Sequence, residues 1–250
     1  MEKIEKTENQ IVFKTETSET LANSIRRYLN QIPVMAIDDV EISKNDSPLY
    51  DEAIAHRLGL VPLKTDKGVN EKSTGKLKLK VEKEGIVHSG ELKGEPSVVY
   101  KGIPITTLAE GQEIEIVANV KSGKGSEHAK FSPGLMFYRN VSEVTLDKSF
   151  SEEVKSICPD NEIKEKSGKI VITDDQKKEV LDVLESLAQK KGKKAEVEPK
   201  NQLVITLESF GQISPEEMFR KSIEALEKDL ANFEKAIDKV WFVLITTKNI

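Results

Sequence analysis

The chain of 250 residues contains a single cysteine, Cys158, so neither an intramolecular disulfide nor a cysteine-based zinc site can form. Long apolar runs are missing as well. No stretch approaches the roughly 20 apolar residues of a membrane-spanning helix, and the first ten residues, MEKIEKTENQ, lack the apolar core of a secretion signal. We therefore expect a protein of a reducing, cytoplasmic compartment with no membrane partner.

An excess of positive charge is also missing. The formal net charge is −5, whereas a general nucleic-acid binder would be basic. Hydrophobic residues make up 37% of the chain and charged residues 32%, which indicates a modest core beneath a highly charged surface. This length allows one large domain or two to three small ones.

Sequence motifs of catalysis are not found. The basic, glycine-rich segment 121–134, KSGKGSEHAKFSPG, lacks the Gly-Lys-Ser/Thr of a phosphate-binding loop. His56, His88 and His128 have no metal-ligand or nucleophile partner at useful spacing, and no carboxylate pair suggests an acid and a base. We predict no catalytic residues, no metal ligands and no cofactor-binding residues. An enzyme that acts through 121–134 is one further interpretation, although such an enzyme would lack a nucleophile.

An amphipathic helix is predicted near the N-terminus. Ser18 is a suitable N-cap, and Pro33 ends the helix because it disfavours helical geometry at the residue before it. Arg26 and Arg27 flank the apolar stripe, either as a solvated face or as a docking site for an acidic partner surface. The stripe consists of Leu21, Ile25, Tyr28, Leu29 and Ile32.

Short strands and turns dominate the next part of the chain. Alternation of apolar and polar residues, with frequent glycine and proline, predicts a β-rich middle third. A short helix is expected at 50–58, and a longer one at 173–190 with Thr173 as its N-cap. The predicted strands are 10–14, 38–43, 77–81, 113–120, 168–172 and 202–208.

The C-terminal segment carries the clearest pattern. Residues 214–217, SPEE, form a capping box with proline at the first helical position, so a helix about 40 Å long is expected over 215–241. The helix lies on its own sheet or shares an apolar seam with another chain, and the two are compatible. The seam consists of Phe219, Ile223, Leu226, Leu230, Phe233, Ile237 and Val240, with heptad spacing.

Three blocks of the sequence carry a family resemblance. Residues 20–63 include LANSIRRYLNQIPVMAIDDVEI and DEAIAHRLGLVPL, residues 123–133 read GKGSEHAKFSP, and 207–230 include ESFGQISPEEMFRKSIEALEKDL. They resemble the α-like subunits of cellular RNA polymerases, in the archaeal–eukaryotic branch and nearest to the archaeal D subunits. The resemblance spans nearly the whole chain.

The resemblance implies an α+β fold: a discontinuous helix–sheet dimerisation domain (1–45 and 202–250), a β-rich inserted domain (46–150) and a small α/β module (151–201). It also implies a noncatalytic assembly subunit of DNA-directed RNA polymerase. In that family, a small α-like subunit, called L in archaea, pairs with this one. The pair holds small zinc-binding subunits and the large catalytic subunits, and contact with DNA is indirect.

The resemblance assigns roles to particular residues. The seam from Phe219 to Ile237 would face subunit L, and Arg26 and Arg27 would contact a large subunit. Many archaeal members carry a ferredoxin-like module with four or more cysteines that hold iron–sulfur clusters, whereas 151–201 offers only Cys158. We therefore expect a reduced module without a cluster. The alternative function is a stand-alone, transcription-related binding protein that homodimerises through the C-terminal seam.

Overall fold

The computed structural model describes residues 1–247 apart from 67, 71, 160 and 167, with the side chains of the last helix described as far as 238. The chain divides into two compact units. The first unit consists of Met1–Asn23 and Met136–Glu208, and the second of Ser24–Leu135 and the chain from Ser209 onward. Both units are therefore discontinuous in sequence.

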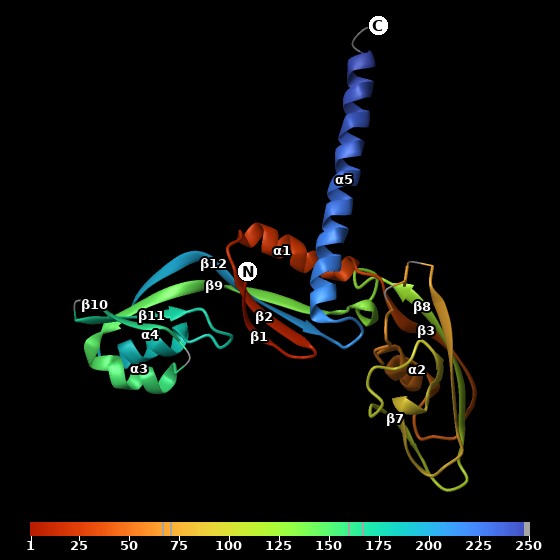
Figure 1. Cartoon of the computed structure of the whole chain (residues 1–250). Coiled ribbons are helices and arrows are strands. Elements are labelled where there is room, and N and C mark those ends of the chain that lie inside the picture. The colour runs from red at the N-terminus through yellow and green to blue at the C-terminus, as the bar shows by residue number, and fades with distance from the viewer. Residues whose placement is uncertain (67, 71, 160, 167, 248–250) are drawn as a thin grey trace. The chain divides into compact units, whose positions relative to one another are not determined.

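The first unit is built on a six-stranded sheet with the order β1-β2-β12-β9-β11-β10 (Figure 1). β2 pairs antiparallel with both β1 and β12, and β11 pairs antiparallel with both β9 and β10. The N-terminal hairpin therefore shares one sheet with strands from the last third of the chain. The strands are β1 (Glu2–Lys6), β2 (Gln10–Thr15), β9 (Gly134–Asp147), β10 (Ile163–Lys166), β11 (Lys169–Asp174) and β12 (Glu196–Ser209).

Two helices, α3 (Ser151–Ile157) and α4 (Leu181–Lys190), complete the first unit, with a short 3-10 turn, η4 (Lys148–Phe150), before α3. Their apolar side chains pack against alternate residues of β9 and β11. Phe150 and Leu184 are fully buried in this cluster. Alternation in β11, with Ile170 and Ile172 facing the helices, positions the sheet against them.

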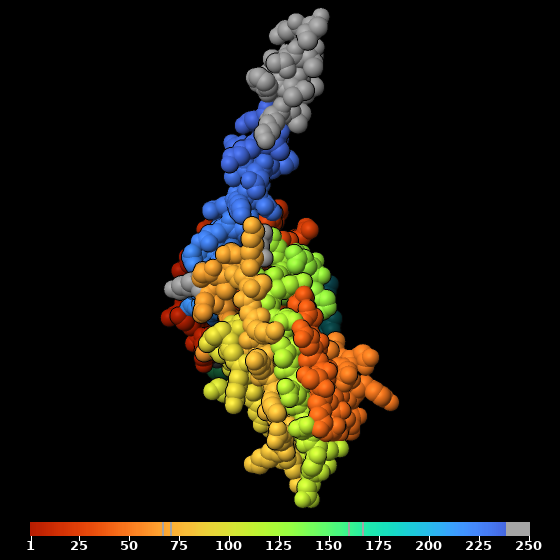
Figure 2. Space-filling model, turned by 90° about the vertical axis from the view of Figure 1, so that its right-hand side faces the viewer, coloured from red at the N-terminus to blue at the C-terminus, as the bar shows by residue number. Residues whose placement is uncertain are grey.

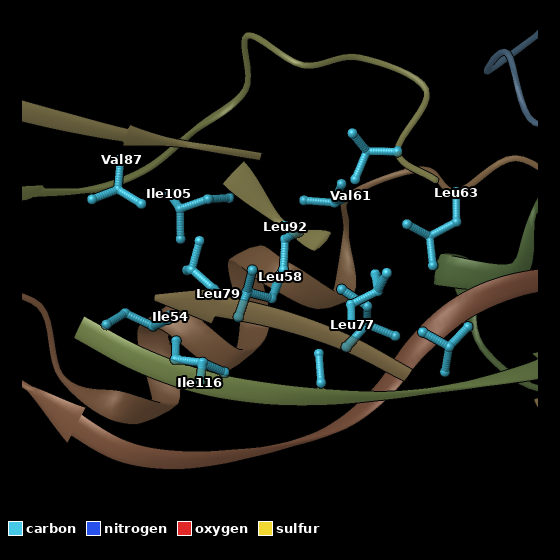
Figure 3. Packing of buried hydrophobic residues seen from close by; sticks show 14 of the residues in the cluster. Ile54, Leu58, Val61, Leu63, Leu77, Leu79, Val87, Leu92, Ile105 and Ile116 are labelled. Carbon is cyan, nitrogen blue, oxygen red and sulfur yellow. The ribbon is translucent and has the colours of Figure 1, made fainter. Parts of the chain in front are cut away.

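The second unit holds a four-stranded sheet with the order β3-β8-β4-β6 and a separate β5-β7 pair. The helix α2 (Asp51–Gly59) lies over the core of this unit, where its residues Ile54 and Leu58 belong to the same hydrophobic cluster as Leu77 and Leu79 of β4 (Figure 3). The strands are β3 (Val34–Asn45), β4 (Thr74–Val81), β5 (Gly85–His88), β6 (Lys93–Glu95), β7 (Pro104–Leu108) and β8 (Ile114–Gly123). Two short 3-10 turns are η2 (Ser89–Glu91) and η3 (Ala129–Phe131).

The N-terminal helix, α1 (Glu19–Tyr28), begins as predicted, because the Ser18 hydroxyl accepts a hydrogen bond from the backbone N–H of Leu21 at 3.2 Å. It ends earlier than expected and gives way to a 3-10 turn, η1 (Leu29–Gln31), before the proline. The predicted stripe is wrong at Leu21, whose side chain is 47% exposed. Ala22 is buried in its place, since Ala22, Ile25 and Leu29 lie on one helical face.

The predicted helix 173–190 is wrong over its first eight residues. Thr173 and Asp174 end β11 and pair with β9, and α4 begins only at Leu181. Asp174 is 1% exposed, and its Oδ2 accepts hydrogen bonds from the backbone N–H groups of Val180 (3.3 Å) and Leu181 (3.2 Å). The helix N-terminus is therefore satisfied by a residue at the end of a strand rather than by Thr173.

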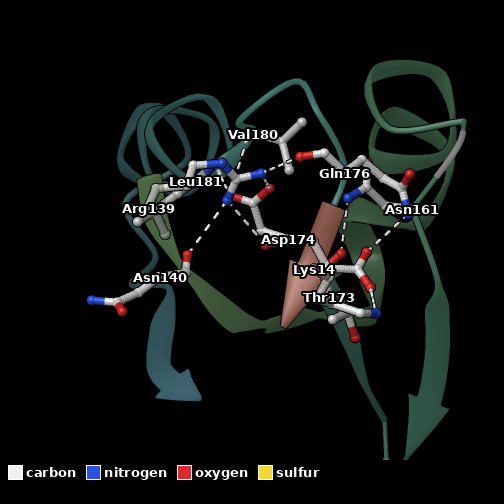
Figure 4. A network of polar contacts seen from close by, with 10 residues as sticks. Lys14, Arg139, Asn140, Asn161, Thr173, Asp174, Gln176, Val180 and Leu181 are labelled. Carbon is white, nitrogen blue, oxygen red and sulfur yellow. Dashed lines mark hydrogen bonds and ion pairs between the residues drawn. The ribbon is translucent and has the colours of Figure 1, made fainter. Parts of the chain in front are cut away.

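A polar network surrounds this aspartate (Figure 4). Arg139 of β9 donates from Nη2 to Asp174 Oδ1 at 3.0 Å and from Nη1 to the Asp174 carbonyl at 3.1 Å. Nearby, Nζ of Lys14 in β2 donates a hydrogen bond to Oδ2 of Asp175 at 2.6 Å within an ion pair. This hydrogen bond raises the pKa of Lys14. The network joins β2 and β9 to the loop that leads into α4.

The other predicted elements are confirmed, with longer bounds in most cases. The segment predicted as a strand at 202–208 starts six residues earlier, at Glu196, and the expected short helix at 50–58 is α2. The division into domains at 45/46, 150/151 and 201/202 stays a prediction. β3, assigned to the dimerisation domain, pairs with β8, and β10 and β11 of the predicted third module continue the six-stranded sheet.

Candidate subunit interface

The C-terminal helix, α5 (Pro215–Thr247), begins at the predicted capping box. The Ser214 hydroxyl accepts the backbone N–H of Glu217 at 3.4 Å, and the Ser214 carbonyl accepts that of Met218 at 2.9 Å. Proline at the first helical position costs no hydrogen bond, because that N–H would have no partner within the helix. Thirty-three residues give a helix about 50 Å long at 1.5 Å per residue.

The first three turns of α5 are anchored within the second unit. Met218 and Ser222 are fully buried, one turn apart on the helix. Further along, the hydroxyl of Tyr28 in α1 donates to Asp229 Oδ2 at 3.1 Å, and this hydrogen bond raises the pKa of Tyr28. The contact ties the end of α1 to α5 at the point where α5 becomes exposed.

From Glu227 to Asp238 every described residue of α5 is exposed. The predicted seam therefore divides into two parts. Phe219, Ile223 and Leu226 are half-buried, whereas Leu230, Phe233 and Ile237 are 58%, 64% and 40% exposed. Val240, the last seam position, lies outside the described side chains. Among the described residues, the outer part of the stripe is therefore an exposed apolar surface, and such surfaces are typical of interaction sites.

The two arginines of the N-terminal helix occupy its last turn, and both side chains are exposed. Cations at this end complement the partial negative charge of the helix C-terminus. Arg26 and Arg27 therefore stabilise the C-terminal end of α1. Both residues belong to the second unit, and both are exposed on its surface.

The basic segment 121–134 forms the turn between β8 and β9, from the last residues of β8 through η3 to the first residue of β9. The side chains of Lys121 and Lys130 both bind Asp38, at 2.8 Å and 2.9 Å. Although burial raises the pKa of the Asp38 carboxyl, the hydrogen bonds from the two lysines hold that pKa below its ordinary value. A Cβ at Gly123 would meet the ring of the buried Phe131 at 2.6 Å, so the turn needs glycine there. These lysines fix the turn to β3.

Cys158 follows α3 and is 1% exposed, packed among the apolar side chains beneath the first sheet. Burial raises the pKa of its thiol. Within the part of the chain that the structure describes, no three His, Cys, Asp or Glu residues come together in a metal-binding group. Across the same residues, no helix has the length and apolar character needed to cross a membrane.

Several known proteins are similar in sequence to this chain. The family model of the insert domain of the RNA polymerase subunits Rpb3 and RpoA matches residues 36–151, which run from β3 into α3. The DNA-directed RNA polymerase subunit Rpo3 of Pyrococcus furiosus is 32% identical over 255 aligned residues, covering 95% of this chain and 96% of the relative. This chain belongs to the Rpo3 family of DNA-directed RNA polymerase subunits.

Rpo3 proteins of other organisms are similar to this chain as well. That of Thermococcus kodakarensis is 32% identical over 88% of this chain and 90% of its own length. That of Pyrococcus horikoshii is 41% identical over a shorter stretch, 59% of this chain and 62% of the relative. The predicted resemblance to α-like polymerase subunits and the predicted α+β fold with a β-rich insert are thereby confirmed.

Two features of α1 and its contacts were not predicted from the sequence. The Tyr28–Asp229 hydrogen bond joins residues 201 positions apart, and no local pattern signals it. The exposure of Leu21 had a usable signal, because Ala22 fits the spacing of Ile25 and Leu29 at three and seven residues.

Proposed function

We propose that this Rpo3-family chain is a noncatalytic assembly subunit that pairs through the α5 seam with a small α-like subunit, called L in archaea. The observation that carries the proposal is the exposure of Leu230, Phe233 and Ile237 in an unbroken heptad pattern. Burying each of these side chains contributes about 1.5–3 kcal/mol. Together they offset a good part of the translational and rotational cost of association, about 4–15 kcal/mol.

The arginines extend the proposal to a second partner. The guanidinium groups of Arg26 and Arg27 are exposed on α1, and a planar guanidinium binds carboxylates with two parallel hydrogen bonds. We therefore assign them to an acidic surface on a large catalytic subunit. The small zinc-binding subunits would join the same platform, and contact with DNA would pass through these partners.

The experiment is light scattering of the purified chain, alone and co-expressed with subunit L. We expect a stable 1:1 heterodimer, and we expect Leu230→Asp to abolish it, because a carboxylate in a buried apolar seam loses its hydration. Asn232→Asp places the same charge on an exposed position of α5 outside the seam and should pair normally.

Normal heterodimer yield from Leu230→Asp would refute the seam as the pairing surface. A symmetric homodimer of the chain alone, unaffected by L, would instead favour the stand-alone binding protein.

A further inference from the structure

A cavity of about 640 Å³ lies at the base of α5, on a different side of the helix from the seam. Lys72 and Asn70 line it from the loop before β4, Gln31 from η1, and Lys228 and Asp229 from α5. Figure 2 shows this region, where the orange segment near residue 70 meets the base of the blue helix. All of these residues belong to the second unit.

The lining is cationic. Among the described residues of the lining, Lys72 and Lys228 contribute positive charges beside one carboxylate, Asp229, which already accepts the hydroxyl of Tyr28; Lys124 lines the cavity as well. Several lysines of the same unit, including Lys44, Lys121 and Lys130, form ion pairs. By contrast, the described residues supply no ion pair to Lys72 or Lys228. Like charges around one cavity repel each other, and a carboxylate bound between them would relieve this.

The cavity and the seam can be occupied at the same time. Lys228 stands two residues from both Leu226 and Leu230, and residues two apart point to nearly opposite sides of a helix with 3.6 residues per turn. A polypeptide that covers the seam therefore leaves Lys228 accessible on the cavity side of α5.

We propose that this cavity binds an acidic side chain of a second polymerase polypeptide, distinct from the one that covers the seam. The inference rests on the proposed function of the chain as an assembly subunit. A protein carboxylate fits better than nucleic acid for two reasons. The cations line one concave site rather than a long groove along which a phosphate backbone could lie, and the chain as a whole carries a charge of −5.

The test uses the heterodimer of the full chain with subunit L. Its affinity for the remaining polymerase subunits is measured at low and high salt, for the wild type and for Lys72→Glu/Lys228→Glu. Both side chains are exposed, so the variant should fold, and unchanged thermal unfolding will check this. Lys78→Glu is the matched control, because Lys78 is also an exposed lysine and lies on β4, outside the lining of the cavity.

We expect the double variant to bind the remaining subunits at least tenfold more weakly at low salt, with the difference shrinking at high salt as charges are screened. Its affinity for L should stay within twofold of the wild type. A milder variant, Lys72→Gln/Lys228→Gln, should show a smaller loss.

Three results would overturn the inference. One is undiminished binding of the remaining subunits by the double variant. Another is an equal loss of affinity for L, which would make the cavity part of the seam interface. The third is binding of a labelled single-stranded DNA to the wild-type heterodimer that the double variant abolishes, which would identify nucleic acid as the occupant. Failure of the wild type to pair with L would count against the proposed function instead.

Discussion

Replacing Asp174 by alanine should destabilise the first unit more than replacing any exposed acidic residue of that unit by alanine. The carboxylate is 1% exposed and meets three donors: Arg139 at 3.0 Å and the backbone N–H groups of Val180 and Leu181 at 3.3 and 3.2 Å. The alanine variant would lose both the ion pair and the hydrogen bonds at the start of α4.

The magnitude follows from the two lost contacts. Removing one partner of a buried ion pair costs about 3–5 kcal/mol, and losing a helix cap costs about 1 kcal/mol. The Arg139 side chain is 18% exposed and keeps its hydrogen bond to the Asp174 carbonyl, which lowers the first figure. We expect Asp174→Ala to reduce the free energy of unfolding by about 3–4 kcal/mol. Asp174→Asn should cost less, because it retains a neutral acceptor.

The assay is urea unfolding of the full chain, followed by circular dichroism, with separate transitions analysed separately because the chain has two units. Asp182→Ala is the control. Asp182 is an exposed acid in the first turn of the same helix, and its loss should cost less than about 1 kcal/mol through the helix dipole. If Asp174→Ala cost no more than Asp182→Ala, the network in Figure 4 would not stabilise the fold as argued.

Two further predictions concern the turn at 121–134. Gly123→Ala puts a methyl group 2.6 Å from the buried Phe131 ring, so it should lower the free energy of unfolding by about 1–3 kcal/mol in thermal or urea unfolding. Asp38→Asn should lower stability at pH 7, because the pKa of Asp38 in the folded state is held down by Lys121 and Lys130. A carboxyl group whose pKa is lowered by folding stabilises the folded state above its unfolded pKa, near 4, and this stability is lost as the pH falls through the lower folded pKa. The difference in unfolding free energy between wild type and variant should therefore shrink below about pH 4, and a constant difference would contradict this.

Local sequence patterns predicted the elements whose structure is set by residues close together in the chain. The alternation LKLKV places Leu77 and Leu79 in the core and leaves their lysine neighbours exposed, and β4 follows it. The capping box at Ser214 likewise marks the start of α5 correctly, because its hydrogen bond joins Ser214 to Glu217, only three residues further along the chain.

Sequence reasoning failed where distant residues decide the local structure. Thr173 is followed by residues that suit a helix, yet it pairs with Glu143 of β9, thirty positions earlier. Once Thr173 and Asp174 belong to a strand, the helix can only begin after a connecting loop, and the buried Asp174 then caps it from outside. No periodicity in 173–190 records that pairing, because the strand it depends on lies elsewhere in the chain.

The heptad seam of α5 illustrates a different limit. Its spacing is the same whether the chain itself or a partner covers the stripe, so the pattern alone cannot distinguish an internal helix from an interface. In the structure, the stripe changes along this single helix from partly buried to exposed. Met218 and Ser222 attach the first turns to the second unit, while Leu230 and Phe233 stand exposed beyond them. The stripe continues beyond the part of the helix that its own unit buries, in a member of a family of polymerase subunits, and this supports the proposal that the exposed part pairs with another subunit.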